Sequence, residues 1–218
     1  MIDPRGTQGS GDDERFTRRL EAFSDLVFGF SLSLLAARLD VPSSAAEILN
    51  GAKIAAFVIT FGIICALWLE HYRIFRHHFV ARPFEVIVNF IFLFGLASLP
   101  YALLTFLRFG AEPKSLDLYF GDIALILTTL STLRLRGLRQ RGRALDESTR
   151  LREWRRVVSQ YALALILALL VAATAIGWIT PRALFGAPAL VIAVFVFALR
   201  RIIRRLPAFL SDKPSSNP

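Results

Sequence analysis

The sequence predicts an all-α, polytopic membrane protein with six transmembrane helices and both termini in the cytoplasm. Three observations support this fold class. The 218 residues are 55% hydrophobic, whereas soluble domains are typically about 45–50% apolar. The apolar residues are gathered into long runs, and a bilayer-spanning helix needs about 20 of them. Lys and Arg residues gather between these runs.

Six apolar runs approach the length of a membrane span. We expect helices at about 19–39, 52–75, 83–107, 116–133, 157–179 and 182–206. The fourth run is the weakest, because Asp117 and Asp122 leave only 123–133 as a continuous apolar stretch. Residues 15–206 then form one six-helix transmembrane domain. The polar ends, 1–14 and 207–218, are expected to be disordered tails.

The distribution of positive charge supports an even number of spans. In the six-span arrangement, 21 of the 26 Lys and Arg residues fall on one side of the membrane and 5 on the other. Loops rich in Lys and Arg stay in the cytoplasm. Both termini are therefore predicted to be cytoplasmic.

Composition also excludes several classes of function. Cys65 is the single cysteine, so neither a disulfide within the chain nor a cysteine-based zinc site is possible. His77 and His78 lack further ligands, and we predict no metal and no cofactor. The net charge of +9 sits at the ends of apolar runs, which argues against nucleic acid as a partner. No nucleophile–base pair points to an enzyme.

The first span is unusually polar for a helix that faces lipid. Asp25 lies inside it, and Gly29, Ser31 and Ser33 interrupt its apolar face. A carboxylate at the centre of a bilayer costs about 2.5–3.5 kcal/mol on insertion scales, so such residues face protein or water. We expect this helix to be surrounded by protein or to line an aqueous path.

Polar residues on the next two spans are candidate partners for this helix. In the six-span topology Ser24, Asp25, Trp68, His71 and Asn89 come to similar depth near the cytoplasmic side. A hydrogen-bonded cluster of these side chains would satisfy their polar groups. Taken singly, Trp68 is also typical of an interfacial aromatic belt and Asn89 of simple contact between helices. The agreement in depth favours the cluster.

Three segments resemble a known family. Arg19–Asp25 has the pattern R-x-x-x-F-S-D, which is similar to the hallmark of the transmembrane protein 175 family of potassium channels. The resemblance continues in Trp68–Arg73 on the second span, and in Asn89–Phe94 and Leu99–Tyr101 on the third. It implies a homotetramer of six-helix subunits whose first helices line a central pore, narrowed by apolar side chains rather than by a carbonyl filter.

The resemblance assigns residues to two roles. The pore-lining and constriction positions carry over to Phe30, Ser33, Leu34 and Ala37. The structural network that holds the pore helix carries over to Arg19, Phe23, Ser24, Asp25, Trp68, His71 and Asn89. The chain departs from the family pattern at Phe30, where Ile or Leu is usual, at Ala37, where Leu is usual, and at Leu26, where a small residue is common.

The sequence thus predicts a potassium-permeable, homotetrameric cation channel in a bacterial cytoplasmic membrane. Its partners would be further copies of the chain, membrane lipid and monovalent cations, with K⁺ as the permeant ion. Two alternatives stay open. Asp25 and His71 could titrate and relay protons in a weakly selective leak. The arginine-rich link 135–152 could instead bind partners of a non-conducting membrane protein.

Overall fold

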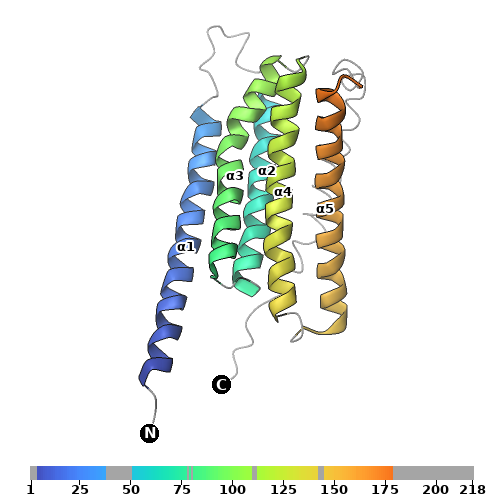
Figure 1. Cartoon of the computed structure of the whole chain (residues 1–218). Coiled ribbons are helices and arrows are strands. Elements are labelled where there is room, and N and C mark those ends of the chain that lie inside the picture. Colours follow the sequence, from blue (N-terminus) through green and yellow to red (C-terminus); the bar gives the residue numbers. More distant parts are fainter. Residues whose placement is uncertain are drawn as a thin grey trace.

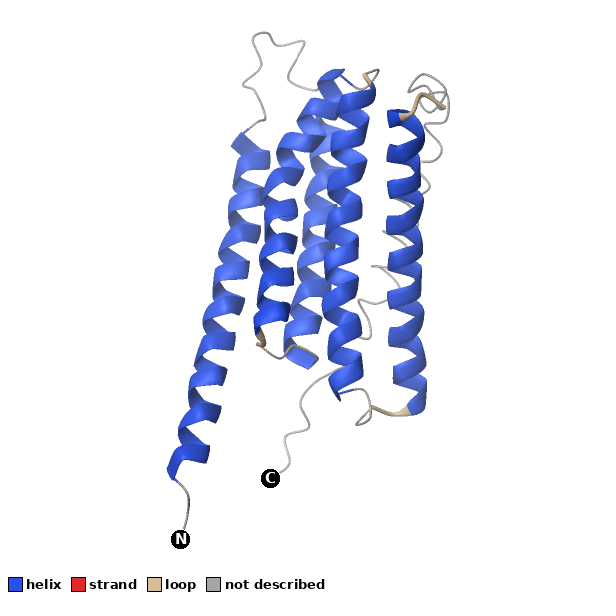
Figure 2. Ribbon diagram, in the orientation of Figure 1, coloured by secondary structure: helices blue, strands red, loops and turns tan. Residues whose placement is uncertain are grey.

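The computed structural model describes residues 4–37, 51–77, 79, 81–109, 112–141 and 145–178. Within these ranges the regular secondary structure is all helix, joined by short loops and turns (Figure 2). Five helices follow one another along the chain: α1 (Pro4–Ala37), α2 (Gly51–His77), α3 (Pro83–Phe109), α4 (Pro113–Arg141) and α5 (Glu147–Ala175). Each contains a stretch long and apolar enough to cross a membrane. The described part is that of a multi-pass membrane protein.

Local sequence signals explain several helix ends. Pro83 and Pro113 are the first residues of α3 and α4, a position where the missing N–H of proline costs nothing. Asp146 precedes α5 and accepts a hydrogen bond from the backbone N–H of Thr149 at 2.9 Å, which is the N-cap arrangement. After α5, Gly177 takes a positive φ of 77°, as a glycine following a helix commonly does.

The helices stand side by side as a bundle (Figure 1). The main contacts are α3 with α4 and α4 with α5, and α1 packs against α2 and α3. The core between α1, α2, α3 and α4 includes Phe28, Ile64, Phe92, Leu96 and Ile126. In this arrangement α1 lies at the edge of the described bundle, with one side in contact and the other open.

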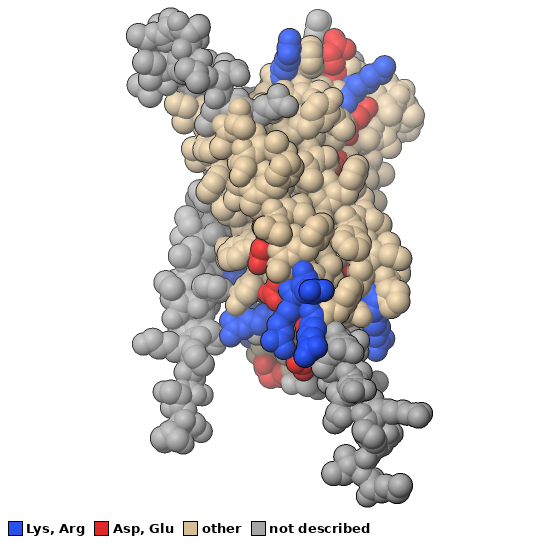
Figure 3. All heavy atoms as spheres, turned by 90° about the vertical axis from the view of Figure 1, so that its left-hand side faces the viewer, with Lys and Arg blue, Asp and Glu red and all other residues tan. Residues whose placement is uncertain are grey.

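Charged side chains collect toward the ends of the bundle. Figure 3 faces the α1 side of the molecule, and its middle is mostly free of charge. Lys and Arg gather mainly below this apolar band, at the end where α1 begins, with fewer above it. This is the pattern expected of a protein with a membrane-embedded middle.

The helix bounds differ from the predicted spans in informative ways. α4 runs to Arg141 and α5 starts at Glu147, so the link predicted at 135–152 is mostly helix. Arg and Leu are good helix formers, and the arginine-rich composition extends both helices beyond the apolar core. α1 starts at Pro4, so most of the segment expected to be a disordered tail is helical.

Two predicted segments have no structural counterpart to compare. The sixth span, 182–206, and the C-terminal tail, 207–218, lie outside the described residues. The count of six helices and the cytoplasmic placement of both termini stay predictions.

Candidate functional site

One stripe of α1 is buried against α2 and α3. Leu20, Ser24, Phe28, Ser31 and Leu35 are spaced three or four residues apart and are all at most 5% exposed. Such spacing places side chains on one helix face. Two of the five are serines, and their hydroxyls donate to backbone carbonyls one turn earlier in the same helix. The buried face of α1 therefore carries polar groups that are partly satisfied within the helix.

A chain of hydrogen bonds joins this stripe to α2 and α3. The Ser24 hydroxyl donates to the Leu20 carbonyl at 2.8 Å, so its single hydrogen is used and its oxygen is left to accept. The Asn89 amide nitrogen donates to that oxygen at 3.2 Å. The Asn89 amide oxygen then faces His71 Nε2 at 2.9 Å, so Nε2 carries the hydrogen. Every bond in the chain runs in one direction, from α2 through α3 to α1.

Aromatic rings enclose the imidazole at the start of this chain. His71 is 1% exposed. Its ring lies parallel to that of Phe92, with centroids 5.2 Å apart and an interplanar angle of 11°. Phe75 lies 4.5 Å from it, centroid to centroid, and Phe28 approaches it edge-on at 5.6 Å. The packing fixes the ring plane, so Nε2 points at Asn89.

A second contact ties the edge of α1 to α2. Trp68 Nε1 donates to Asp25 Oδ1 at 2.9 Å. The indole is 38% exposed and stacks on Tyr72 with ring centroids 5.9 Å apart. Phe23, about 200° from Asp25 around α1, packs edge-on against Phe90 of α3 at 6.0 Å. The Asp25 carboxylate is thus held by an indole N–H.

The predicted network residues therefore fall into two groups. Hydrogen bonds between helices join Trp68 to Asp25 and, separately, His71 through Asn89 to Ser24, and Phe23 packs against Phe90. Arg19 is exposed, and no hydrogen bond or ion pair in the described ranges links it to this group. What these residues do for conduction stays a prediction.

The predicted pore-lining residues occupy the other side of α1. Phe30 is 57% exposed, Ser33 and Ala37 are exposed, and Leu34 is half-buried. The Ser33 hydroxyl donates to the Gly29 carbonyl within the helix at 2.8 Å. At 100° per residue, Phe30, Ser33 and Ala37 point away from the buried stripe. Their side chains are open in the single chain, and their place in a pore stays a prediction.

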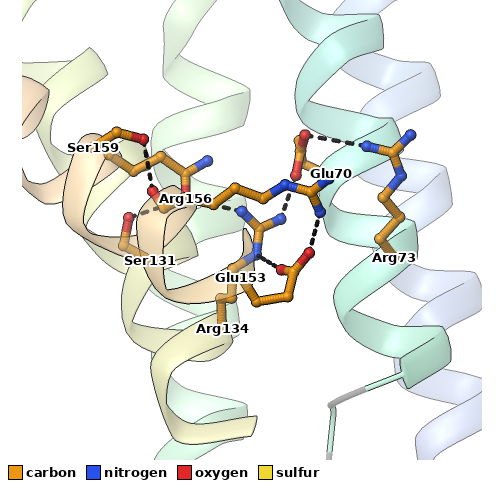
Figure 4. Close-up of polar contacts among 8 residues, drawn as sticks. Glu70, Arg73, Ser131, Arg134, Glu153, Arg156 and Ser159 are labelled. Atoms are coloured by element: carbon orange, nitrogen blue, oxygen red, sulfur yellow. Dashed lines mark hydrogen bonds and ion pairs between the residues drawn. The ribbon is translucent and has the colours of Figure 1, made fainter. Parts of the chain in front are cut away.

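Sequence reasoning missed a buried cluster of charges between α2, α4 and α5 (Figure 4). Arg134 of α4 has a side chain only 1% exposed. Its guanidinium pairs with Glu70 of α2, lies 3.4 Å from a carboxylate oxygen of Glu153 of α5 and donates to Gln160 at 3.1 Å. Glu153 also pairs with Arg156. The cluster joins three helices through alternating charges.

The missed cluster had a signal in the sequence. Glu70 lies between Trp68 and His71, inside a segment singled out for its neighbours, and Arg134 directly follows the predicted fourth span. A similar contact fixes the start of α3, where Arg136 and Gln140 of α4 donate to the buried Glu85 at 3.0 and 2.9 Å. Among the described residues no three His, Cys, Asp or Glu side chains are placed to hold a metal ion.

Comparison with known proteins finds one family in this part of the chain. Residues 19–100 match the model of the family TMEM175, described as endosomal/lysosomal potassium channel TMEM175. The match covers the R-x-x-x-F-S-D pattern, the segment around Trp68 and His71, and the segment around Asn89. The resemblance predicted from these segments is confirmed. The family is one of ion channels and not of enzymes.

Relatives and solved structures agree with this family. A potassium channel of Marivirga tractuosa is 29% identical over 114 residues, which are 52% of this chain and 44% of that protein. The match thus spans about half of this chain and less than half of the relative. A crystal structure described as a lysosomal potassium-selective channel TMEM175 homolog from Chamaesiphon minutus is 20% identical, with a TM-score of 0.59 over 88% of this chain and 99% of that chain.

A second solved structure has the same fold. The potassium channel MtTMEM175, solved in complex with a Nanobody-MBP fusion protein, is 19% identical with a TM-score of 0.60, over 86% of this chain and 93% of that chain. At these levels of identity the two structures establish a shared fold.

Proposed function

We propose that this chain, whose residues 19–100 match the potassium channel family TMEM175, is one subunit of a homotetrameric, potassium-permeable cation channel. The single observation that carries the proposal is the division of α1 into two faces. One face is tied to α2 and α3 by hydrogen bonds and aromatic packing, and the other is open along Phe30, Ser33 and Ala37. In a tetramer the open face would surround the symmetry axis.

The chemistry of the open face suits a pore narrowed by side chains. Phe30 and Leu34 stand one turn apart and would form two stacked apolar rings when four copies meet. Hydrophobic constrictions of this kind gate by dewetting. Ser33 would add hydroxyls between them, and Ala37 would leave the far end wider. Because these residues are uncharged, the pore would bind ions weakly and let them leave.

The hydrogen-bonded network supports the pore helix in this proposal. Residues that hold a helix in place need not touch ions, and Ser24, Asn89 and His71 are at most 1% exposed. Their role is to fix the rotation of α1 about its axis, so that the Phe30 side faces the other subunits. The proposed location is the cell membrane of a bacterium, with both termini in the cytoplasm. Lipid would surround the remaining helices.

Potassium flux into liposomes tests the proposed pore. We expect Phe30→Ala and Leu34→Ala to change the rate of potassium flux or its preference over sodium, because each removes a ring of four side chains. Phe94→Ala is the matched control, since Phe94 is 69% exposed on α3 and would face outward. If both α1 variants conduct as the parent does, the pore does not pass along this face.

Cross-linking tests the assembly separately. In a Cys65→Ser background, Phe30→Cys would bring thiols together at the symmetry axis, and oxidation would yield covalent dimers of subunits. Phe94→Cys in the same background would give none. Cross-links from position 94 but not from 30 would place α1 at the outside of the assembly and overturn the proposal. A flux that depends on pH and is equal for K⁺ and Na⁺ would favour a proton leak instead.

A further inference from the structure

A carboxylate lies buried between α3 and α4, away from the face of α1 assigned to the pore. Asp122 is 8% exposed, and both helices are candidate membrane spans at this level. The helices approach closely here because α3 has a glycine opposite. A Cβ on Gly95 would lie 2.9 Å from Ile126 Cγ1 and 3.3 Å from Asp122 Oδ1. Small residues allow such close approach between membrane helices.

The two short contacts of Ser98 would each have a hydrogen of their own if Asp122 carried a proton. Ser98 Oγ lies 2.8 Å from Asp122 Oδ1 and 3.0 Å from the Gly95 carbonyl oxygen. A serine hydroxyl has one hydrogen, and both neighbours are acceptors when the acid is ionised. If Asp122 carries a proton on Oδ1, it donates to Ser98 Oγ, and the Ser98 hydroxyl donates to Gly95. Both short contacts are then hydrogen bonds.

The second carboxyl oxygen supports the same protonation state. Asp122 Oδ2 is buried and has no hydrogen-bond partner among the described residues. Burying an ionised carboxylate without a partner costs far more free energy than burying the neutral acid, so such a group binds a proton instead. The described Lys and Arg side chains form no ion pair with Asp122, in contrast to the carboxylates of Glu70, Glu85 and Glu153.

Among the described residues of α3, α4 and α5, the titratable groups nearest Asp122 supply no positive charge. On α4 itself the nearest titratable side chains are Tyr119 and Asp117, and Asp117 is bonded to a threonine of α5. Between residues 86 and 107 of α3 the titratable side chain is Tyr101, which is 65% exposed. On α5 beyond residue 156 it is Tyr161, which contacts Thr132 at 2.8 Å. None of these can neutralise a carboxylate.

We propose that Asp122 is a proton-binding site outside the pore, and that its bound proton completes a hydrogen-bond chain from Asp122 through Ser98 to the Gly95 carbonyl. The ligand of this site is a proton, held at neutral pH. Through it α4 donates to α3, and the contact between the two helices depends on the proton being present. The inference concerns the fold and is independent of ion conduction.

Infrared difference spectroscopy of the purified full-length protein tests the site directly. A protonated carboxylic acid has a C=O stretch well separated from carboxylate bands. We expect the parent at neutral pH to show such an acid band that Asp122→Asn removes, because asparagine keeps the shape and the donor but has no acid. Asp117→Asn is the matched control and leaves this band in place. Loss of a carboxylate band in Asp122→Asn, with the acid region unchanged, would overturn the proposal.

A second variant keeps the test valid if Asp122→Asn does not fold. Ser98→Ala removes the acceptor of the acid proton, so the same acid band should move to higher frequency. It should also lower the ratio of folded to unfolded protein by about 3- to 20-fold, as expected for one hydrogen bond between membrane helices. An acid band that stays in place in Ser98→Ala would show that the proton is not shared with Ser98, and would also overturn the inference.

A bound alkali cation is the alternative occupant that the same chemistry allows. The thermal midpoint of the parent, measured in K⁺, Na⁺ and choline buffers, separates the two. A midpoint that is equal in all three supports a proton. A midpoint raised by K⁺ or Na⁺ in the parent but not in Asp122→Asn would assign the site to a metal cation and refute the proton.

Discussion

Asn89 of α3 links α2 to α1 through hydrogen bonds, and its removal should be costly. The side chain is fully buried, accepts from His71 Nε2 at 2.9 Å and donates to Ser24 at 3.2 Å. Hydrogen bonds between membrane helices average about 0.6 kcal/mol and reach about 1.7, so the two together contribute about 1–2 kcal/mol. Asn89→Ala also leaves the buried Nε2 hydrogen without an acceptor, at about 1–3 kcal/mol. We expect a total loss of about 2–5 kcal/mol.

Unfolding by SDS in mixed micelles, followed by the helical circular dichroism signal at fixed protein concentration, measures this loss. Ile91→Ala is the control, because Ile91 is two positions along the same helix and 40% exposed, so its removal breaks no polar contact. In a double-mutant cycle, the variant with both Ser24→Ala and Asn89→Ala should lose less stability than the sum of the two single variants, since they share one hydrogen bond. If Asn89→Ala costs no more than Ile91→Ala, the reasoning from the hydrogen-bond chain fails.

Two further perturbations test contacts at the ends of the helices. Glu70→Ala removes one of two carboxylates from the buried Arg134 guanidinium. We expect a loss of about 3 kcal/mol in the same SDS assay, which is the lower end for a broken buried ion pair because one carboxylate remains. A loss under about 1 kcal/mol, as for an exposed ion pair, would contradict this expectation. Hydrogen bonds from Ser148 and from Thr149 lower the pKa of Asp146. Its contribution to stability is therefore present above the unfolded-state pKa of about 3.9 and is lost as the pH falls below that value. Asp146→Ala should lower the thermal midpoint at neutral pH, and the difference from the parent should vanish in strong acid; a difference independent of pH would rule out the carboxylate as the cause.

The helical architecture could be predicted from sequence because apolar run length is a direct consequence of bilayer thickness. The positions of helix ends could not, because they depend on contacts beyond the apolar core. α5 begins ten residues before its predicted span, at Glu147, since an N-cap at Asp146 and a buried pairing of Glu153 stabilise the extra turns. The pattern of apolar residues alone does not predict either contact.

The candidate site was predictable to the extent that depth is readable from sequence. Ser24, His71 and Asn89 come to the same level in the six-span topology, and their hydrogen bonds follow from that level together with helix rotation. Arg134 could not be placed in this way. A residue near a span end is expected at the interface, and only the packing of α5 against α4 buries its guanidinium between Glu70 and Glu153.

The two halves of α1's surface also explain why its polar residues are tolerated. Ser24 and Ser31 turn toward α2 and α3, where helix packing and hydrogen bonds satisfy them. Ser33 and Asp25 lie outside that stripe, and the Asp25 carboxylate has one indole N–H as its partner between helices. A single neutral donor does not offset the transfer of a carboxylate into hydrocarbon. The proposed central pore would place water and further copies of the chain beside the open side of α1, which would lower this cost.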